Sequence, residues 1–220
     1  MGKKENPNLH KTTSPPKMKL AKEFRDAETK EVGFKFVDYH ISEDKTLFQT
    51  HLHYDQLYTW KMGEISKYAM GLLEGKLMGT KCPKCGDVLF PPRVNCWNLD
   101  CNLVKTEWIE LAQTGKVHTF TVAGWSGRSS LKQLPFVLAY VILDGVTTAV
   151  ANEIREIEPW DAEFNMPVKV KWVPKDQRVG AIVDFHFVPA DGWKPSAMNA
   201  EKERIKQLCE PVYKWVKTMK

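Results

Sequence analysis

The sequence predicts a mainly β protein with flanking helices, built from a metal-bound ribbon followed by a small closed barrel. Three observations predict this class. Four of the five cysteines lie within residues 82–101. Segments with the alternation typical of β-strands follow between residues 104 and 188. Helical periodicity is strongest on the two flanks, over residues 56–78 and 195–218.

The composition is typical of a globular protein with its own core. Of the 220 residues, 43% are hydrophobic and 27% are charged, which excludes wholesale disorder. No apolar run approaches the length of about 18 residues that a membrane-spanning helix requires. The N-terminus is charged without an apolar segment behind it, which is not typical of a secretory signal. We therefore expect a cytoplasmic protein with no membrane partner.

The excess positive charge lies in the N-terminal segment. Residues 1–30 hold eight Lys or Arg and four Asp or Glu, whereas residues 31–220 hold 24 and 23. A nucleic-acid-binding domain usually concentrates basic residues on its surface. We therefore expect no nucleic acid partner, although Lys169, Lys171 and Lys175 could form a local basic strip.

Shifts in composition divide the chain into five segments. Polar residues and prolines dominate the start, which predicts a disordered tail. The segments are the tail over 1–20, a hairpin and helix over 21–80, a zinc ribbon over 81–102, a barrel over 103–190 and a C-terminal helix over 191–220.

Residues 32–54 predict a β-hairpin with a polar turn over 42–45. Phe34 and Phe36 alternate with a lysine, and the return strand places apolar residues on one face. The other face carries His51 and His53, whose spacing allows a shared metal. We favour a solvated strand face as the explanation of the two histidines, because no third ligand lies nearby.

Residues 56–78 predict a helix that is apolar on more than one side. Met62, Ile65, Ala69, Leu72 and Leu73 recur at helical spacing, and the opposite flank carries Trp60 and Tyr68. Such a helix must be covered on more than one side. The cover is either the hairpin or another protein.

The cysteines give the sharpest signal in the sequence. The sequence Cys82-Pro-Lys-Cys85-Gly begins the cluster. Ten residues separate Cys85 from Cys96, and four separate Cys96 from Cys101. A C-x-x-C turn lets two thiolates meet one metal, and a second pair closes a tetrahedral site. Four thiolates with no open position indicate structural zinc rather than a catalytic metal. Disulfides conflict with the expected compartment.

Five strand-like segments between residues 104 and 188 predict the barrel. The first is a long strand over 104–123 that is broken near Gly115, and Asp144-Gly145 marks a hairpin turn between two others. In the last segment, Val183, Phe185 and Phe187 share one face while Asp184 and His186 share the other. Five strands with a connection before the fourth fit a Greek-key barrel of the OB type better than a sandwich. The expected strands are 104–123, 135–143, 146–153, 167–173 and 180–188, with a short helix or loop over 154–164.

The C-terminal helix carries an apolar stripe that includes Cys209, so we interpret this cysteine as a small core residue. The stripe is Ile205, Leu208, Cys209, Val212 and Val216. Pro211 is expected to kink the helix or to end its first half.

Established catalytic motifs are absent from the sequence. It has no phosphate-binding glycine loop, no H-E-x-x-H and no G-x-S-x-G. His118 is interpreted as a half-buried strand residue, and no nucleophile can be paired with it from sequence. We therefore assign no catalytic residue. A stand-alone enzyme using His118 or His186 is kept as an alternative.

Several motifs give the chain a resemblance to a known family over roughly residues 56–190. The motifs are YTWKMG at 58–63, LEGKL at 73–77, KCPKCG at 81–86, FPPR at 90–93, GKVHTFT at 115–121 and PFVLA at 135–139. Together they resemble the acyl-CoA-associated OB-fold proteins with an N-terminal rubredoxin-like zinc ribbon, which accompany thiolases. The second cysteine pair departs from the family's usual C-x-x-C spacing.

The resemblance implies a non-catalytic subunit that binds zinc through Cys82, Cys85, Cys96 and Cys101. It implies a thiolase-fold catalytic partner in a hetero-oligomer, with an acyl-CoA ligand. Lys84 and Arg93 are candidates for holding coenzyme A, because basic residues grip its phosphates. Trp60, Tyr68 and Trp97 are candidates for the partner interface.

The family occurs in several acyl-CoA settings. We favour thiolytic cleavage of a 3-oxoacyl-CoA in a degradation pathway, such as an aromatic succinyl-CoA intermediate of anaerobic toluene breakdown. The alternatives are a hydroxymethylglutaryl-CoA synthase/acetoacetyl-CoA thiolase complex and a retro-aldolase. An alternative of another class is a single-stranded nucleic-acid-binding module, since zinc ribbons and OB folds also serve that purpose.

Overall fold

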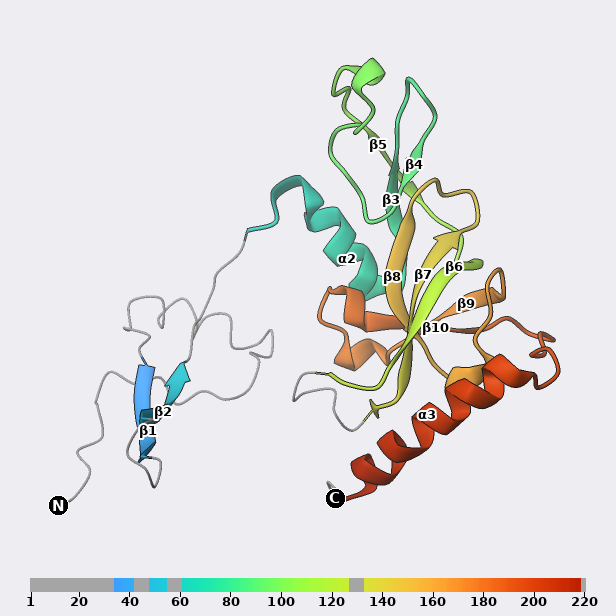
Figure 1. The fold of residues 1–220 in the computed structure, drawn as a ribbon. Helices are drawn as coiled ribbons and strands as arrows, with labels where there is room; N and C mark the ends of the chain where they lie inside the picture. Colours follow the sequence, from blue (N-terminus) through green and yellow to red (C-terminus); the bar gives the residue numbers. More distant parts are fainter. Residues whose placement is uncertain (1–33, 42–47, 55–60, 127–132, 219–220) are drawn as a thin grey trace. The chain divides into compact units, whose positions relative to one another are not determined.

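The computed structural model describes residues 34–41, 48–54, 61–126 and 133–218 (Figure 1). The chain forms two compact units, Met1–Lys61 and Met62–Lys220, which we describe separately. The predicted tail over 1–20 and Trp60 lie outside the described residues. In the described part of the chain, no helix is long and apolar enough to cross a membrane.

The first unit contains the predicted hairpin. Strand β1 (Phe34–Ile41) pairs antiparallel with β2 (Phe48–Tyr54), with a register shift between Phe36 and Asp38. The predicted turn over 42–45 lies outside the described residues. A metal site at His51 and His53 stays a prediction.

The second unit is built on a closed barrel of five strands in the order β10-β8-β7-β6-β9. Its pairs are antiparallel except for β10 with β8, which is parallel. This order is the Greek-key arrangement predicted from the strand pattern. The strands are β6 (Thr114–Ala123), β7 (Phe136–Leu143), β8 (Ala149–Ile154), β9 (Pro167–Trp172) and β10 (Phe185–Pro189).

The closure of the barrel depends on a close approach at Gly115. Gly115 pairs with Leu143 on β7 and with Val168 on β9. A Cβ atom at Gly115 would lie 2.5 Å from the carbonyl oxygen of Ile142, so a side chain cannot fit there without moving the backbone. The turn between β7 and β8 contains Gly145 at φ 76°, as the Asp-Gly pair predicts.

The predicted long first strand is wrong in its N-terminal half. Residues 107–110 form a separate strand, β5 (Glu107–Glu110), which pairs with β3 (Met78–Lys81) rather than continuing into the barrel. Together with β4 (Val88–Leu89), these strands make a three-stranded sheet in the order β4-β3-β5. The ribbon therefore extends beyond the predicted segment 81–102, because two of its three strands, β3 and β5, lie before and after the cysteines in sequence.

The first helix of the second unit is shorter than predicted. A 3-10 turn, η2 (Gly63–Ile65), leads into α2 (Ser66–Glu74), whereas residues 78–81 are already strand β3. Gly75 ends the helix in the left-handed conformation at φ 81°. Arg178 donates to the carbonyl oxygen of Leu73 and stacks over Trp172 of the barrel, which ties the helix end to β9.

The predicted faces of the last barrel segment are reversed before Phe185. Residues 182–184 form a 3-10 turn, η7 (Ile182–Asp184), in which Val183 is exposed and Asp184 is buried. The Asp184 carboxylate accepts hydrogen bonds from the amides of Val179, Gly180 and Ala181. The alternation starts only at Phe185, where β10 begins.

One apolar core runs from α2 through the base of the ribbon into the barrel. An aromatic series marks this path: Tyr68 contacts Phe90 at 5.8 Å between ring centroids, and Phe90 lies 6.5 Å from Phe185. Phe185 in turn contacts Phe187 in an edge arrangement. The base of the ribbon and the barrel therefore form one packed body.

Helix α3 (Ala200–Lys217) lies against the barrel beside the 3-10 turn η5 (Pro159–Asp161). The helix continues through Pro211, so the prediction that this residue ends its first half is wrong. Cys209 is buried as predicted, whereas Leu208 of the same stripe is exposed. Lys202, which is 6% exposed, donates to Glu163 at 2.6 Å and to the carbonyl oxygen of Ser196 at 2.9 Å.

Candidate metal centre and partner surface

The thiols of four cysteines gather in the ribbon. The loops that carry them lie at the end of the ribbon farthest from the barrel (Figure 1). The sulfur atoms of Cys82, Cys85, Cys96 and Cys101 all lie within 4.8 Å of one another. The Sγ atoms of Cys82 and Cys101 are 3.8 Å apart, and those of Cys85 and Cys96 are 3.7 Å apart. Tetrahedral Zn²⁺ with Zn–S bonds of about 2.3 Å requires sulfur pairs about 3.8 Å apart. The four cysteines therefore fit one zinc ion.

The backbone of the first knuckle is arranged around Cys82. The amides of Lys84 and Cys85 both donate to the Cys82 sulfur at 3.4 Å. These hydrogen bonds, from Cys85 first, lower the pKa of the Cys82 thiol to about 6. Gly86 at φ 83° lets the chain turn back after the knuckle. A thiolate is the form that binds zinc, so this knuckle is prepared for a metal.

The longer spacing of the second knuckle has a local structural explanation. A 3-10 turn, η3 (Leu99–Cys101), occupies the extra residues between the two cysteines. Asn98 begins the turn by accepting a hydrogen bond from the amide of Asp100, and Asn102 ends it at φ 56°. The turn brings Cys101 back to the other sulfur atoms.

The site is closed, which is the arrangement of a structural metal. Cys82, Cys96 and Cys101 are buried, and Cys85 is exposed at the surface. Burial raises the pKa of the Cys101 thiol to about 12, so a cation must stabilise the thiolate of this residue. Four sulfur ligands leave no coordination position for a substrate. The metal would hold the two knuckles together, and no reaction step is assigned to it.

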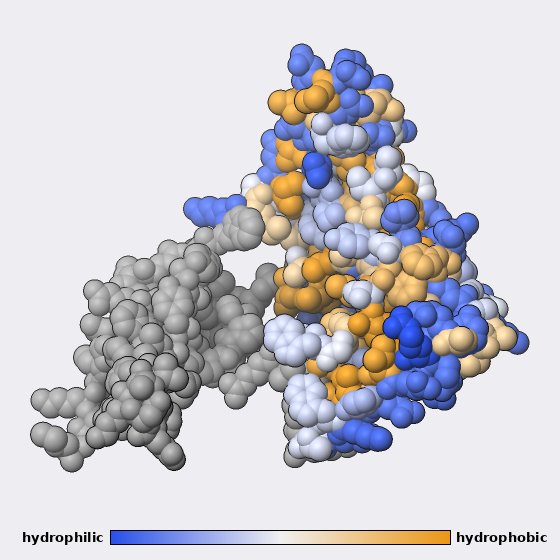
Figure 2. Space-filling view, in the orientation of Figure 1, coloured by the Kyte–Doolittle hydropathy of each residue, from blue (hydrophilic) through white to orange (hydrophobic). Residues whose placement is uncertain are grey.

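The second knuckle exposes three large apolar side chains. Trp97 is 54% exposed, Leu99 89% and Leu103 67%. Leu103 also holds φ at 55°, a conformation that a leucine rarely adopts. Figure 2 shows hydrophobic residues at the surface of this end of the molecule, surrounded by hydrophilic ones. We call Trp97, Leu99 and Leu103 the knuckle patch.

The sequence analysis named Trp97 but missed the two leucines. The sequence could have indicated that they are exposed, because Leu99 and Leu103 lie on either side of Cys101 in a short loop with no core of its own to bury them. The sequence does not show that η3 and the left-handed residue Leu103 after it leave these side chains exposed.

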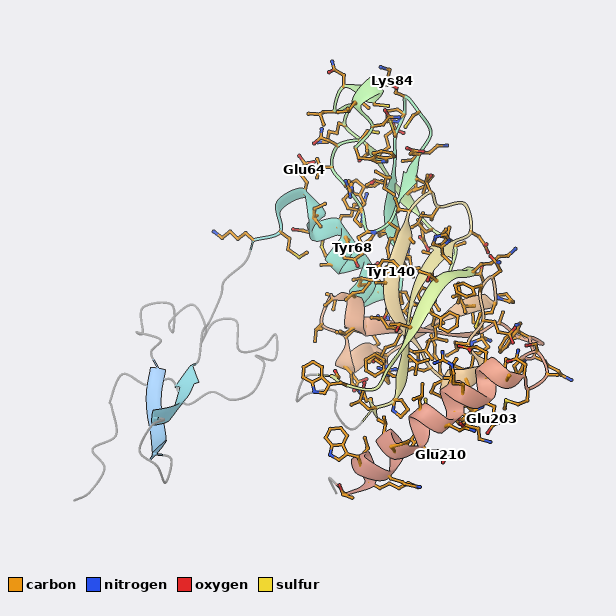
Figure 3. All side chains as sticks on the ribbon, in the orientation of Figure 1. Glu64, Tyr68, Lys84, Tyr140, Glu203 and Glu210 are labelled. Atoms are coloured by element: carbon orange, nitrogen blue, oxygen red, sulfur yellow. The ribbon has the colours of Figure 1, made fainter. Side chains whose placement is uncertain are left out.

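The two residues proposed to hold coenzyme A lie at different levels of the ribbon. Lys84 is exposed at its far end, where its ammonium group bonds the carbonyl oxygen of Asp100 (Figure 3). Arg93 is exposed nearer the base, where its backbone exchanges hydrogen bonds with the Thr80 hydroxyl. The structure does not join the two side chains in one contact.

Tyr68 lies in the core rather than on the surface. Its ring packs against Phe90, and burial raises the pKa of its phenol to about 12, with the charge of Asp184 adding to the effect. A partner cannot reach this ring in the described conformation. We therefore leave Tyr68 out of the proposed interface, and Trp97 is the described residue that remains in it.

The two histidines considered for catalysis are differently placed. His118 is exposed at a register shift of β6, so its predicted half-burial is wrong. His186 is half-buried, and burial together with the charge of nearby Arg155 lowers its pKa. Among the described residues, no side chain forms a hydrogen bond with either ring.

A zinc ribbon joined to a five-stranded closed barrel defines a class of two-part zinc-ribbon and OB-fold proteins. Two family models match these parts. The model described as "ChsH2, rubredoxin-like zinc ribbon domain" matches residues 71–100, and "ChsH2, C-terminal OB-fold domain" matches residues 108–173. Within that class, the chain belongs to the DUF35 family, as the following relatives show.

Two archaeal relatives carry the description "DUF35 domain-containing scaffold protein". The one from Methanocaldococcus jannaschii is 34% identical over 120 residues, which cover 52% of this chain and 82% of the relative. The one from Methanothermobacter thermautotrophicus is 28% identical over 95 residues, which cover 43% of this chain and 69% of the relative.

Two solved structures are similar at lower identity. The structure described as "Ltp2-ChsH2(DUF35) aldolase" has a TM-score of 0.48 at 21% identity, covering 60% of this chain and 98% of that chain. A DUF35 protein of unknown function from Sulfolobus solfataricus has a TM-score of 0.43 at 17% identity, covering 58% of this chain and 87% of that chain.

Proposed function

We propose that this chain is the non-catalytic, zinc-binding subunit of a cytoplasmic thiolase-type acyl-CoA complex. It supports assembly with a thiolase-fold catalytic partner that cleaves a 3-oxoacyl-CoA by thiolysis. The degradation of an aromatic succinyl-CoA, as in anaerobic toluene breakdown, is the setting that we favour. A retro-aldolase or a hydroxymethylglutaryl-CoA synthase/acetoacetyl-CoA thiolase complex is the second choice within the same role.

The knuckle patch is the observation that carries this proposal. Exposed tryptophan and leucine side chains on a rigid element are typical of an interface anchor. The left-handed conformation of Leu103 costs on the order of 1 kcal/mol, and such strain is concentrated at functional positions. The curated relatives are described as scaffold proteins, which agrees with a surface built for assembly.

The proposal includes coenzyme A as a ligand shared with the partner. Lys84 and Arg93 are exposed on the ribbon, on the same element as the knuckle patch. Each would add one cationic contact to the phosphates of coenzyme A at the edge of the interface.

Two of the three lysines of the candidate basic strip, Lys169, Lys171 and Lys175, form ion pairs, which weakens the nucleic-acid alternative. Lys169 pairs with Asp191 at 2.5 Å, and Lys171 pairs with Glu156. Two of the three lysines that could form the strip are thus matched by acidic neighbours, so this strip is not a run of unmatched positive charge.

Purification of the tagged chain from its native cells tests the proposal. We expect a thiolase-fold enzyme to co-purify in stoichiometric amount, with one zinc per chain. The complex should convert a 3-oxoacyl-CoA and coenzyme A into two shorter acyl-CoA products, whereas the isolated chain should have no turnover. Turnover by the isolated chain, or purification without an acyl-CoA enzyme, would contradict the proposal.

Paired tryptophan variants test the patch itself. Trp97→Ala should weaken partner binding by at least about tenfold, because buried tryptophans dominate interfaces. Trp125→Ala is the matched control, since Trp125 is 79% exposed but lies two residues after the end of β6, outside the ribbon. Equal binding by the two variants would remove the ribbon from the interface.

A further inference from the structure

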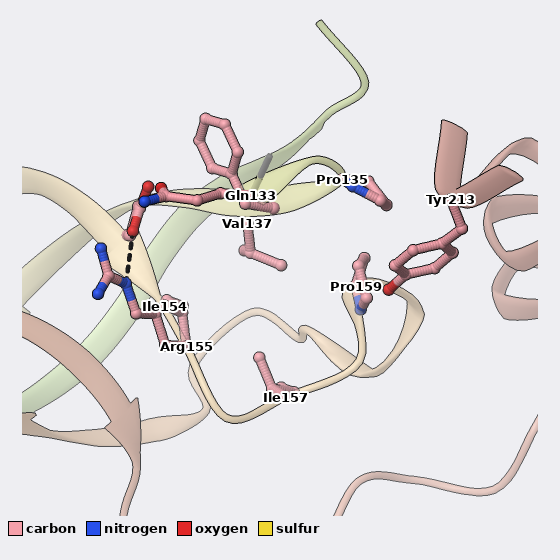
Figure 4. Close-up of a pocket in the computed structure, with 10 residues that line it drawn as sticks. Gln133, Pro135, Val137, Ile154, Arg155, Ile157, Pro159 and Tyr213 are labelled. Atoms are coloured by element: carbon pink, nitrogen blue, oxygen red, sulfur yellow. Dashed lines mark hydrogen bonds and ion pairs between the residues drawn. The ribbon is translucent and has the colours of Figure 1, made fainter. Parts of the chain in front are cut away.

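A cavity separate from the metal centre lies between the barrel and helix α3 (Figure 4). Its volume is about 290 Å³. The walls come from the start of β7, the end of β8, the turn η5 and one residue of α3. Helix α3 lies outside residues 71–100 and 108–173, so the two family models do not account for this wall.

The floor of the cavity is apolar and rigid. It is formed by Pro135, Val137, Ile154, Ile157 and Pro159. All of these except Ile157 are buried in the body of the protein. Prolines and strand residues lose little freedom when a ligand binds, so the floor is preorganised for a compact hydrocarbon body.

The polar groups lie at the two ends of the floor. Gln133, Glu153 and Arg155 occupy one end, and Tyr213 of α3 occupies the other. Burial, with the nearby charge of Glu158, raises the pKa of Tyr213 to about 12, so this ring stays neutral. An apolar floor with a few oriented polar groups is the usual composition of a small-molecule site.

Arg155 determines which ligand charge the site favours. Its Nε donates to Glu153 at 2.6 Å, which fixes the guanidinium at the end of the cavity. Its two terminal nitrogens form no hydrogen bond with any residue that the structure describes. A guanidinium can donate hydrogen bonds from this free edge to a second carboxylate. The Glu153 carboxylate is already paired with Arg155. A protonated amine would therefore be repelled by the Arg155 charge and would find no unpaired carboxylate at this end of the cavity.

We propose that this cavity binds a small carboxylic acid, with the hydrocarbon body on the proline and isoleucine floor and the carboxylate at Arg155. The cavity is at the lower end of the size range of ligand sites, which fits a body of about six carbons. This inference does not depend on the role proposed for the ribbon, because no ribbon residue lines the cavity.

A titration of the full-length, zinc-loaded chain with hexanoate tests the inference. The isoleucine methyl groups report binding by NMR, because Ile154 and Ile157 line the cavity whereas Ile109 and Ile142 do not. We expect saturable shifts at the first pair with a dissociation constant on the order of 1 mM. Hexylamine and hexan-1-ol should bind at least about tenfold more weakly, because they lack the charge-assisted hydrogen bond.

Two arginine variants separate the site from general effects of charge. Arg155→Gln should weaken hexanoate binding by about tenfold or more. Arg204→Gln is the matched control, because Arg204 also pairs with a nearby glutamate, at 2.7 Å, but does not line the cavity. Ile157→Trp should fill the cavity and abolish the shifts, while unchanged Ile109 and Ile142 signals report an intact fold.

The inference is overturned by any of three results. The first is the absence of a saturable hexanoate shift at Ile154 and Ile157. The second is binding of hexylamine as tight as that of hexanoate. The third is equal binding of hexanoate by the Arg155→Gln and Arg204→Gln variants. None of these results bears on the thiolase-type partner, which is tested separately by co-purification.

Discussion

The barrel and the far end of the ribbon are stabilised by different means. The barrel, with α2 and the ribbon base, encloses 18 buried residues of one continuous apolar core. The end of the ribbon has a separate cluster of Cys82, Cys96 and Cys101, with Val104 packed beside it. Hydrophobic burial can therefore hold the barrel, whereas the end of the ribbon has too little apolar area to fold on that basis.

This difference explains how the ribbon can expose apolar residues. A segment held by a core needs most of its apolar side chains to point inward. A segment held by four sulfur–metal bonds has no such requirement, so Trp97, Leu99 and Leu103 can face solvent. The metal thus frees the knuckle for binding, and the barrel supplies the fixed body from which it projects.

Loss of a zinc ligand should have the largest effect. Structural zinc contributes on the order of 10–16 kcal/mol in small zinc modules. Cys101→Ser should lose the metal and unfold the end of the ribbon, as measured by zinc content and by the fluorescence of Trp97. Cys209→Ser changes a buried cysteine of α3 that is not a ligand, and it should keep one zinc per chain. Zinc retention by Cys101→Ser would remove this residue from the ligand set.

Truncation of a core side chain should destabilise the barrel, which is the region held by apolar packing. Phe187 is fully buried, and Phe187→Ala should lower the free energy of unfolding of the barrel by about 3–5 kcal/mol. Urea unfolding followed by circular dichroism measures the loss. Phe164→Ala, at a position that is 64% exposed, should cost far less. A similar loss for both variants would contradict a barrel held by its interior.

Helix α3 adds a third means of stabilisation, a buried cation. Lys202→Met leaves Glu163 and Asp161 without their shared ammonium group, which should cost about 2–3 kcal/mol because both carboxylates are still partly solvated. Lys214→Met on an exposed part of the helix is the matched control. Urea unfolding again gives the measurement, and equal stability of the two variants would show that the buried ion pair does not hold the helix.

The same ion pair predicts a dependence on pH. Burial acts to raise the pKa of Glu163, but hydrogen bonds from Lys202 and Ser196 outweigh it and lower the pKa below its ordinary 4.5. A lowered carboxyl pKa stabilises the folded state above the ordinary value, and this stability is lost as pH falls through the folded value. Glu163→Gln should therefore flatten the decline in stability below about pH 4.5. An unchanged acid profile would contradict this role of Glu163.

The smallest effect on stability is expected at the knuckle patch. Trp97→Ala should change the free energy of unfolding by no more than about 0.5 kcal/mol, because the side chain is exposed and supports no core. Thermal unfolding checks this value. A large loss would mean that the tryptophan holds the ribbon together, and its effect on partner binding could then not be assigned to the interface.

The sequence predicted those features that depend on short-range patterns. Strand alternation and the Asp144-Gly145 turn were sufficient for the barrel, and cysteine spacing was sufficient for the metal centre. The hairpin followed from the same alternation, and the structure confirms its strand pairing.

Features that depend on tertiary contacts were missed. The strand pattern of residues 107–110 would be the same if they formed the start of the first barrel strand or paired with β3. The pattern alone therefore could not assign them to the ribbon. Tyr68 looked like an interface residue because the partner of its ring, Phe90, is 22 positions away in sequence. The cavity was invisible for the same reason, since Tyr213 reaches it from the far end of the chain.

Hydrogen exchange on the zinc-loaded and zinc-stripped full-length chain tests the central comparison most directly. We expect removal of zinc to abolish amide protection over residues 81–106 and to leave β6 through β10 protected, because the barrel keeps its own apolar core. Equal loss of protection in the barrel, or retained protection in the ribbon without metal, would contradict the division between a metal-held knuckle and a core-held barrel.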